Sequence, residues 1–369
     1  MRVALIHDWL TGMRGGEKVL EALCEQFPSA ELFTLVHVPG AVSPTIEALP
    51  RHTSFLQWVP QLRRFYRQAL LAFPTAIELF NLDGFDLVVS SSHCAAKSVI
   101  VPGRARHVCY CHTPMRYAWD QFPNYFGTER LGRIGSRAAA IAMRRLARWD
   151  AATAGRVNRY VANSGYVAGR IRRYYGRDAV VVYPPVDTAF YSPDGRAPEP
   201  YFLIVSALVP YKRIDIAIEA AHLAGLRLRI VGDGPDRSRL LSAAGPGVAF
   251  LGTRTNEEIR ELYRGATAVI LPGEEDFGIV AVEAQACGRP VVSRAVGGAL
   301  ETVIAGRTGV LVDTPGPEAL AKGLREAAER PFEPSVIRRH AERFSRERFA
   351  AEIRAAINDT LSSSGENRW

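Results

Sequence analysis

The sequence predicts an α/β protein built from two doubly wound, Rossmann-like domains. Its 369 residues exceed the length of one ordinary domain, and 47% hydrophobic with 23% charged residues is the composition of a globular protein. Short apolar runs alternate with helical patterns in both halves, which is typical of parallel sheets covered on both faces. A segment with five prolines, residues 181–202, separates the two series and is predicted to be an extended linker.

In the first half, the apolar run 2–7 is followed by a glycine-bearing loop and a helical pattern over 17–27. Further buried strands are expected at 31–36, 86–92, 107–112 and 159–164. The pattern starts again after the linker. We expect strands at 201–207, 226–235, 247–252, 267–273, 290–294 and 309–313, and helices at 213–225, 256–266 and 277–287.

We expect a first domain over residues 1–184, a second over 185–345, and a helix over 346–369 that crosses back to the first domain and ends in a frayed tail. Ligands of open α/β sheets bind outside the carboxyl ends of the strands. The loops after the predicted strands should therefore line a cleft between two facing domains.

The stretch "EEDFGIVAVEAQACGRP" (274–290) carries the clearest chemical signal. Phe277 and Gly278 open a helix, where free backbone N–H groups and the positive end of the dipole favour an anion such as a diphosphate. An acidic turn that complements the dipole would explain residues 274–276. It would not explain Glu283, which stands between apolar residues inside the helix, since burying a carboxylate costs free energy unless it is bound.

The five cysteines occur in apolar contexts without a zinc-type spacing, and we expect buried, reduced thiols. No Asp-x-Asp metal motif is evident, so no metal and no cofactor are predicted. The N-terminus does not have the pattern of a signal peptide, and no run reaches the length that spans a bilayer. These features predict a cytoplasmic protein. The net charge of +8 and the lack of a nucleic-acid-binding signature favour an anionic small ligand or membrane surface over nucleic acid.

Several motifs together carry a resemblance to a known family. The segment 272–291 closely resembles the E-x(7)-E signature of retaining family-4 glycosyltransferases, which have the GT-B fold. Further family landmarks follow at "GMRGGEKV" (12–19), "VSALVPYKRID" (205–215), "VGDGP" (231–235) and "FLGTRTNEEIRELY" (250–263). The segment "CHTPMRYAWD" (111–120) looks most like bacterial GDP-mannose-dependent mannosyltransferases of O-antigen and exopolysaccharide assembly. Any one of these motifs alone would be weak evidence.

The resemblance implies roles for individual residues. Glu275 would contact the transferred sugar, Glu283 the ribose, and the backbone of Phe277, Gly278 and Ile279 the sugar and phosphate. Lys212 and Arg213 would neutralise the leaving diphosphate without a metal. The resemblance also places Gly232, Asp233, Gly234, Thr253 and Arg254 at the nucleotide. In the first domain, Gly15 and Gly16 would let the backbone approach the diphosphate, and His112 would lie at the donor sugar.

The chain departs from the family pattern at Ala207, where many members carry an arginine that binds the diphosphate. Arg213, Arg254 or Arg294 could replace that cation. No protein nucleophile is assured in the front-face reaction that the family is thought to use, and Glu275 as a nucleophile stays an open alternative.

The acceptor side is less defined. The basic and aromatic segment 55–73 has roughly helical spacing, and it is either an amphipathic helix on an anionic membrane or an ordinary helix that covers the first sheet. Tyr117, Trp119 and Asp120 are candidate acceptor contacts.

The main hypothesis is a retaining hexosyltransferase that moves a sugar, mannose from GDP-mannose, onto a glycan or polyprenyl-linked glycan, at the cytoplasmic face of the inner membrane. A UDP-sugar transferase, a sugar-nucleotide 2-epimerase, a nicotinamide-dependent oxidoreductase and a non-catalytic sugar-nucleotide-binding protein are the alternatives.

Overall fold

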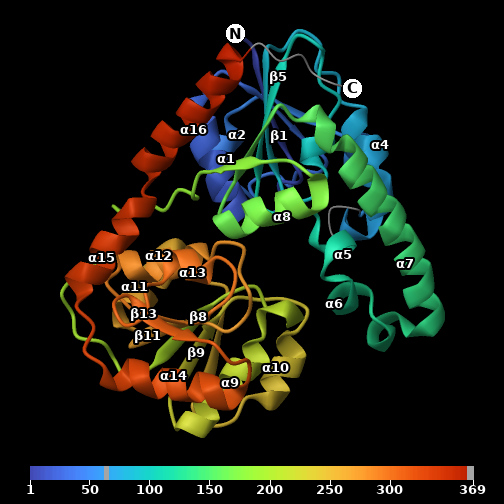
Figure 1. Ribbon diagram of the computed structural model, residues 1–369. Coiled ribbons are helices and arrows are strands. Elements are labelled where there is room, and N and C mark those ends of the chain that lie inside the picture. The colour runs from blue at the N-terminus through green and yellow to red at the C-terminus, as the bar shows by residue number, and fades with distance from the viewer. Residues whose placement is uncertain (62–65, 364–369) are drawn as a thin grey trace. The chain divides into compact units, whose positions relative to one another are not determined.

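A computed structural model describes residues 1–61 and 66–363 of the chain, in two compact units. Unit 1 comprises residues 1–185 and 349–369, and unit 2 comprises residues 186–348. The predicted first boundary, after residue 184, lies one residue before this division. Each unit is an α/β structure with its own parallel sheet (Figure 1). The predicted fold class, two doubly wound Rossmann-like domains, is confirmed.

Unit 1 is built on a seven-stranded sheet in the order β3-β2-β1-β4-β5-β6-β7. The strands are β1 (Val3–His7), β2 (Glu31–Thr34), β3 (Arg51–Thr53), β4 (Leu87–Ser92), β5 (Arg106–Cys111), β6 (Arg159–Ala162) and β7 (Ala179–Val181). The strand order reverses direction between β1 and β4, which pair in parallel from Val3 with Leu87 to His7 with Ser91. Their carboxyl ends therefore form the topological switch point of this sheet.

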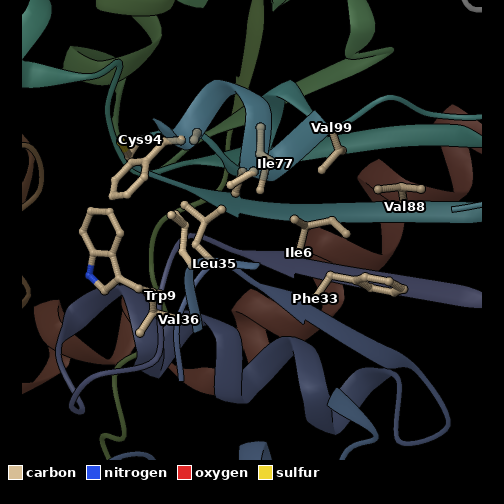
Figure 2. Packing of buried hydrophobic residues seen from close by; sticks show 14 of the residues in the cluster. Ile6, Trp9, Phe33, Leu35, Val36, Ile77, Val88, Cys94 and Val99 are labelled. Atoms are coloured by element: carbon tan, nitrogen blue, oxygen red, sulfur yellow. The ribbon is translucent and has the colours of Figure 1, made fainter. Parts of the chain in front are cut away.

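Helices cover both faces of this sheet, which is why β1 and β4 are buried along their whole length. The helices described between residues 1 and 185 are α1 (Gly15–Gln26), α2 (Pro44–Glu47), α4 (Phe73–Glu78), α5 (Arg116–Trp119), α6 (Phe122–Phe126), α7 (Thr128–Ala152) and α8 (Gly165–Tyr175). One core contains Ile6, Phe33 and Val88, with Trp9 at its edge (Figure 2). Side chains of neighbouring residues, such as Leu5 and Val89, point to the opposite face and form a second core.

The C-terminal helix α16 (Arg346–Ser362) contributes to the second core of unit 1. Phe349, Ile353 and Ile357 are buried there against α1 and the sheet. Arg159 of β6 also donates a hydrogen bond to Thr360 at 3.0 Å. The apolar positions of this helix thus return the end of the chain to unit 1. The frayed tail that we expected lies mostly in residues 364–369, outside the described residues.

Unit 2 is built on a six-stranded parallel sheet in the order β10-β9-β8-β11-β12-β13. The strands are β8 (Phe202–Val205), β9 (Leu228–Val231), β10 (Val248–Gly252), β11 (Ala268–Leu271), β12 (Val291–Arg294) and β13 (Gly309–Val312). The helices are α9 (Ile214–Ala224), α10 (Arg237–Ala243), α11 (Asn256–Gly265), α12 (Ile279–Ala286), α13 (Ala299–Thr302), α14 (Pro317–Glu329) and α15 (Pro334–Ala341). Here the strand order reverses between β8 and β11.

Local sequence signals explain several helix ends. Thr255 and Glu258 form a reciprocal capping box at the start of α11. Ser164 caps α8 by accepting a hydrogen bond from the Val167 backbone N–H. Gly225, in the left-handed conformation, ends α9 where the sequence predicted an end.

The prediction of one helix over residues 55–73 is wrong. Two short 3₁₀ segments, Phe55–Trp58 and Tyr66–Ala72, replace it, and Gln61 has a positive φ of 58° that no continuous helix allows. Phe65 lies outside the described residues. Pro60, which removes a helical hydrogen bond, explains part of the interruption. The short strands β3 and β7 were not predicted, because β3 has only three residues and β7 begins just before the proline-rich segment.

Candidate functional site

The candidate donor site of unit 2 lies at its topological switch point. Strands β8 and β11 are neighbours in the sheet, and Ala268 pairs with Phe202. The loop after β8 carries Lys212, and the loop after β11 carries Glu275. Both residues therefore lie at the carboxyl edge where a doubly wound sheet binds its ligands.

Lys212 and Glu275 form a close ion pair. The Lys212 Nζ atom lies 2.6 Å from each carboxylate oxygen of Glu275, and each of the two side chains is less than one-fifth exposed. Lys212 ends a short 3₁₀ turn, and Arg213 follows it with a φ of 52°, a left-handed conformation uncommon for a residue with a side chain. This tight turn directs the chain from β8 into α9.

Three glycines hold the acidic loop against its neighbours. A Cβ atom on Gly273 would lie 2.8 Å from the Tyr211 carbonyl oxygen, beside the Lys212 turn. On Gly297 and Gly298, which follow β12, a Cβ atom would come within 2.3 Å of the backbone of Glu275 and Phe277. The Gly298 N–H donates to the Glu275 carbonyl at 2.8 Å. Only glycine permits these approaches. None of the three glycines was assigned a role from the sequence, although the pair Gly297–Gly298 is separated by only two residues from a buried strand.

Helix α12 begins directly after this loop. Its N-cap is Gly278, with a φ of 85°, and no side chain caps the helix. The first N–H groups, starting at Ile279, are therefore available to an anion together with the positive end of the helix dipole. Phe277 is 3% exposed and packs against Phe344 with ring centroids 5.5 Å apart, which fixes the start of the helix. The predicted anion site thus has the expected local structure.

Glu283 is buried within α12, at 4% exposure, and its Oε2 accepts a hydrogen bond of 3.0 Å from the Tyr263 hydroxyl of α11. Burial and the Glu283 charge raise the pKa of Tyr263 well above its ordinary range, so this phenol remains a donor. Glu283 is therefore not an exposed carboxylate of an ordinary acidic helix start. Tyr263 is the structural partner that the sequence did not reveal.

The glycines of the predicted nucleotide turn serve loop packing. A Cβ atom on Gly232 would lie 1.9 Å from the Ser206 carbonyl oxygen, and one on Gly234 would lie 2.3 Å from the Leu208 carbonyl oxygen. Asp233 is exposed and accepts a hydrogen bond from the Gly234 N–H. The turn after β9 thereby supports the loop that leads to Lys212.

The candidate replacements for the missing arginine at position 207 differ in their surroundings. Ala207 itself is exposed, two residues after the end of β8. Arg213 contacts Asp215 at 3.3 Å, and Arg254, next to the exposed Thr253, contacts Glu258 at 3.2 Å. Arg294 ends β12, and its Nε atom is buried without a hydrogen-bond partner among the described residues.

In unit 1, His112 directly follows β5 and is partly exposed. Its Nε2 atom lies 2.8 Å from the Ser91 hydroxyl, and its carbonyl accepts a hydrogen bond from Asn163. Burial, followed by the charges of His93 and His7, lowers the pKa of His112 well below its ordinary value, so the imidazole is neutral near pH 7. Gly15 and Gly16 open α1, and a Cβ atom on Gly16 would lie 3.7 Å from both His112 and His7.

Other polar residues surround His112 that the sequence analysis did not single out. His7 is the last residue of β1 and Asp8 follows it, and Ser91 and His93 lie at the end of β4. The Asp8 carboxylate accepts backbone hydrogen bonds from the four residues 93–96 and lies 3.2 Å from His93 Nδ1. The rule that loops after parallel strands carry the site would have identified these residues.

The three candidate acceptor residues lie in or beside α5 and have partners within unit 1. The Trp119 indole N–H donates to Asp150 at 2.7 Å, and its ring stacks on Tyr174. Asp120 is paired with Arg170, and Tyr117 packs edge-on against Tyr125. Trp119 and Asp120 therefore have structural roles, whether or not an acceptor also touches them.

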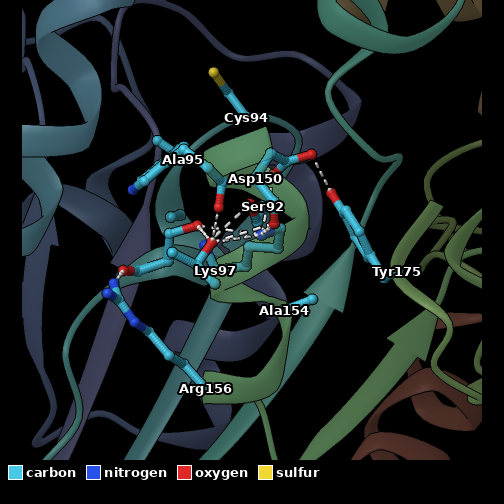
Figure 3. A network of polar contacts seen from close by, with 12 residues as sticks. Ser92, Cys94, Ala95, Lys97, Asp150, Ala154, Arg156 and Tyr175 are labelled. Atoms are coloured by element: carbon cyan, nitrogen blue, oxygen red, sulfur yellow. Dashed lines mark hydrogen bonds and ion pairs between the residues drawn. The ribbon is translucent and has the colours of Figure 1, made fainter. Parts of the chain in front are cut away.

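Asp150 belongs to a buried polar network that supports this region (Figure 3). Lys97 Nζ lies 3.0 Å from the Asp150 carboxylate and also donates to the Asp150 carbonyl at 2.6 Å. The Tyr175 hydroxyl donates to Asp150 at 2.9 Å. These bonds connect the segment after β4 with the ends of α7 and α8.

All five cysteines are buried and free, as predicted. Within residues 1–61 and 66–363, no three His, Cys, Asp or Glu side chains are arranged to hold a metal ion. In the same part of the chain, no helix combines the length and hydropathy needed to cross a membrane.

Comparison with known proteins agrees with the geometry. Residues 13–190 match the model of Glycosyltransferase Family 4, and residues 190–349 match Glycosyl transferases group 1. The solved structure of Anabaena Alr3699/HepE in complex with UDP has a TM-score of 0.70 and 21% identity, and covers 97% of this chain and 100% of its own. Sucrose-phosphate synthase from Thermosynechococcus elongatus has a TM-score of 0.68 and 17% identity, with coverage of 99% and 100%. These similarities define the GT-B fold.

Curated relatives include the D-inositol 3-phosphate glycosyltransferases of Streptomyces bingchenggensis and Geodermatophilus obscurus. The first is 33% identical over 53% of this chain and 52% of its own length. The second is 36% identical over 54% and 52%. The chain thus matches about half the length of these relatives. Two glycosyltransferase family models thus match consecutive parts of this chain, and its fold is that of GT-B glycosyltransferases.

Proposed function

We propose that this protein transfers a hexose from a nucleoside-diphosphate sugar to a hydroxyl group of a glycan or lipid-linked glycan, with retention of configuration. The observation that carries the proposal is the Lys212–Glu275 pair, 2.6 Å apart at the switch point of the unit 2 sheet and directly before the uncapped start of α12. A cation, a carboxylate and free N–H groups at one edge match the diphosphate and hydroxyl groups of such a donor.

The proposed reaction depends on stabilising the charge of the departing diphosphate. Lys212 moves from Glu275 to the phosphate, and the N–H groups at Gly278 and Ile279 supply a second positive end. Released from Lys212, the Glu275 carboxylate accepts hydrogen bonds from hydroxyls of the transferred sugar. Charge stabilisation of this preorganised kind needs no metal. The departing phosphate takes the acceptor proton in a front-face reaction, and no covalent sugar–protein intermediate is required.

For the ribose, we propose Glu283 as the hydrogen-bond acceptor. Its Tyr263 bond orients the carboxylate, and a ribose would reach it beside the start of α12. Thr253 and Arg254, exposed after β10, are proposed to lie at the base.

The donor is proposed to be GDP-mannose, on the resemblance of residues 111–120 to mannosyltransferases. A UDP-sugar is the second candidate. Alr3699/HepE was solved with UDP and with UDP-glucose, and at 21% and 20% identity these structures are evidence for the fold alone.

Thermal unfolding of the purified protein with GDP, UDP, ADP or NAD tests the donor site. A ligand that binds only the native state adds roughly 2.7 kcal/mol of stability at a hundredfold excess over Kd. A rise in Tm with GDP or UDP would identify the base. Glu283→Gln, which keeps the volume and the Tyr263 bond, should reduce that rise for nucleotides with a ribose. A rise with NAD alone would contradict the proposal.

For the acceptor side, we propose that α7 contacts an anionic membrane at the cytoplasmic face. Its exposed residues include five arginines and three apolar side chains, and no acidic residue occurs between positions 130 and 149: Leu131, Arg133, Ile134, Arg137, Ile141, Arg144, Arg145 and Arg148. Ile134 is 87% exposed. Arginines beside exposed aliphatic side chains suit an anionic bilayer surface.

Co-sedimentation with phosphatidylglycerol vesicles tests this contact, with phosphatidylcholine vesicles as the neutral comparison. Binding should require the anionic lipid and weaken with salt, because each arginine near the surface contributes about 1 kcal/mol. Arg144→Gln/Arg145→Gln should weaken it, whereas Arg325→Gln/Arg330→Gln in unit 2 should not. Equal binding to both vesicle types would contradict the proposal.

A further inference from the structure

A chain of four polar side chains connects α1 to His112 across the carboxyl ends of β1, β4 and β5. Glu17 Oε1 lies 3.6 Å from His7 Nε2, an ion-pair distance slightly longer than a hydrogen bond. His7 Nδ1 lies 3.1 Å from the Ser91 hydroxyl, and that hydroxyl lies 2.8 Å from His112 Nε2. Glu17, His7 and Ser91 are almost completely buried, at 4%, 0% and 0% exposure.

We propose that Glu17, His7 and Ser91 act as positioning residues that fix the tautomer of His112, so that its Nδ1 atom is a hydrogen-bond acceptor for a sugar hydroxyl. The inference deepens the proposed function, since the hydroxyl belongs to the donor or acceptor of the sugar transfer. In this role none of the four side chains transfers a proton to the substrate. The chain sets only the direction of its hydrogen bonds.

The direction follows from the Glu17 end. Glu17 Oε2 accepts the Arg14 backbone N–H at 3.0 Å, at the positive start of α1. Burial opposes its ionisation, but the contact with the His7 imidazole and the charge of His93 keep the pKa of Glu17 below its ordinary value. His7 Nε2 is buried without a partner at hydrogen-bond distance among the described residues, and the Glu17 carboxylate is its nearest ion-pair partner. Because an ionised carboxylate can only accept hydrogen bonds, a proton on Nε2, directed at Glu17, is the favourable tautomer of His7.

If His7 is neutral, the two hydrogen bonds of Ser91, to His7 and to His112, can then run in only one direction. Its Nδ1 atom carries a lone pair and accepts the Ser91 O–H. The Ser91 oxygen is left as the acceptor of the Nε2–H of His112. His112 Nδ1 therefore carries a lone pair. If His7 were protonated, its Nε2–H would still point at Glu17, but both hydrogen bonds of Ser91 would reverse and His112 Nδ1 would become a donor.

Neighbouring groups favour the neutral arrangement. The ring centroid of His93 lies 6.1 Å from that of His7 and 6.3 Å from that of His112. A positive charge on one of these three imidazoles therefore opposes a positive charge on the others. Asp8 provides the compensating carboxylate for His93, at 3.2 Å. Tyr110 packs edge-on against His112, with ring centroids 5.2 Å apart. Among the described residues, Nδ1 of His112 has no hydrogen-bond partner, which leaves it available to a hydroxyl.

Two substitutions test the direction of the chain. Ser91→Ala interrupts it, and its matched control is Ser90→Ala, because Ser90 is equally buried and lies 2.8 Å from His107 Nε2 in the same way. Glu17→Gln should reverse the chain. The Arg14 N–H holds the amide oxygen, so the amide NH₂ faces His7 Nε2 and forces a lone pair onto that atom.

The first readout is the ¹⁵N spectrum of histidine-labelled protein at pH 7.5, with the His112 signals assigned through His112→Gln. The proposal predicts an Nε2–H tautomer of His112 in the wild type and in Ser90→Ala, a mixture of tautomers in Ser91→Ala, and an Nδ1–H tautomer in Glu17→Gln. An Nδ1–H tautomer in the wild type, or an unchanged tautomer in both Ser91→Ala and Glu17→Gln, would overturn it.

The second readout is turnover of GDP-mannose and UDP-glucose by the same proteins. Ser91→Ala and Glu17→Gln should lower kcat about tenfold with a smaller change in KM, whereas Ser90→Ala should not. If neither sugar nucleotide is bound or turned over, the proposed function fails. The tautomer measurement still tests whether Glu17, His7 and Ser91 set the direction of the hydrogen bonds to His112. If turnover occurs and both variants retain the wild-type kcat, the role of the chain in the reaction is overturned.

Discussion

Lys212 Nζ lies 2.6 Å from both carboxylate oxygens of Glu275, although 63 residues separate the two in the sequence. The pair joins the loops after β8 and β11, the two strands between which the order of the sheet reverses. In the proposed mechanism the ion pair opens when the donor binds. Lys212 then contacts the diphosphate, and Glu275 contacts the sugar. The ion pair thus holds both charged side chains in position until the donor takes the place of each partner.

Lys212→Met should weaken binding of the cognate nucleoside diphosphate at least tenfold, because a charged contact to phosphate is lost and the unpaired Glu275 repels the ligand. Lys212→Met/Glu275→Gln should recover part of the affinity, since the repulsion is removed. Titration calorimetry measures both. Lys322→Met, an exposed lysine of α14, is the control. Equal affinity in all four proteins would remove Lys212 from the site.

Gly298→Ala should displace the acidic loop. Its φ is ordinary, at −63°, so the only penalty is the Cβ atom, which would lie 2.3 Å from the Phe277 Cα. We expect a loss of about 1–3 kcal/mol in unfolding free energy and a weaker nucleotide-induced rise in Tm. Calorimetric unfolding with and without ligand measures both.

The control for that substitution is Gly169→Ala in α8, where a Cβ atom would meet nothing within 4 Å. It should be neutral or stabilising by up to about 1 kcal/mol, because alanine is the better helix former. A Gly298→Ala protein as stable as Gly169→Ala would show that the loop after β12 accommodates the methyl group.

Asp150→Asn should strongly destabilise unit 1. Lys97 is 1% exposed and would lose its buried counter-charge, which costs about 3–5 kcal/mol. Lys97→Met/Asp150→Asn should regain much of this loss, because no uncompensated charge remains. Thermal unfolding of the two variants against the wild type measures the difference. A double variant less stable than Asp150→Asn would contradict the explanation by charge.

His107 should make stability fall in mild acid. It is fully buried between β4 and the segment after α7, bonded to Ser90 and to the Arg156 carbonyl, and burial lowers the pKa of His107 from 6.5 to about 4. In the unfolded protein His107 therefore becomes protonated near pH 6.5, whereas in the folded protein it becomes protonated only near pH 4. The contribution of neutral His107 to the stability of the folded protein is complete above pH 6.5, and it is lost as the pH falls towards 4.

This lowering of the His107 pKa from 6.5 to about 4 corresponds to on the order of 3 kcal/mol of unfolding free energy. Urea unfolding of the wild type and His107→Gln between pH 7.5 and 4 measures it. The glutamine variant should be less stable at pH 7.5, and its disadvantage should shrink as the pH falls. A constant difference across this range would refute the effect.

The sequence by itself determined the two doubly wound domains and the position of nearly every longer strand, and it supplied the residues of the candidate donor site in unit 2. Periodicity and glycine positions are local properties, and the acidic helix 277–287 needs only its own residues to be recognised. Lys212 was also found locally, as a basic residue at a strand-to-helix turn.

Other features depended on the tertiary structure. Residues 55–73 have a helical spacing, but the chain breaks into 3₁₀ segments there, and the packing of Tyr66 against Trp9 outweighs the local preference. Gly297 and Gly298 matter only because the loop after β12 reaches the acidic loop. The partners of Glu283 and Trp119 come from other helices. The chain from Glu17 to His112 exists only because parallel strands bring residues 7, 91 and 112 to one edge of a sheet, and no local pattern encodes a contact between positions 84 residues apart.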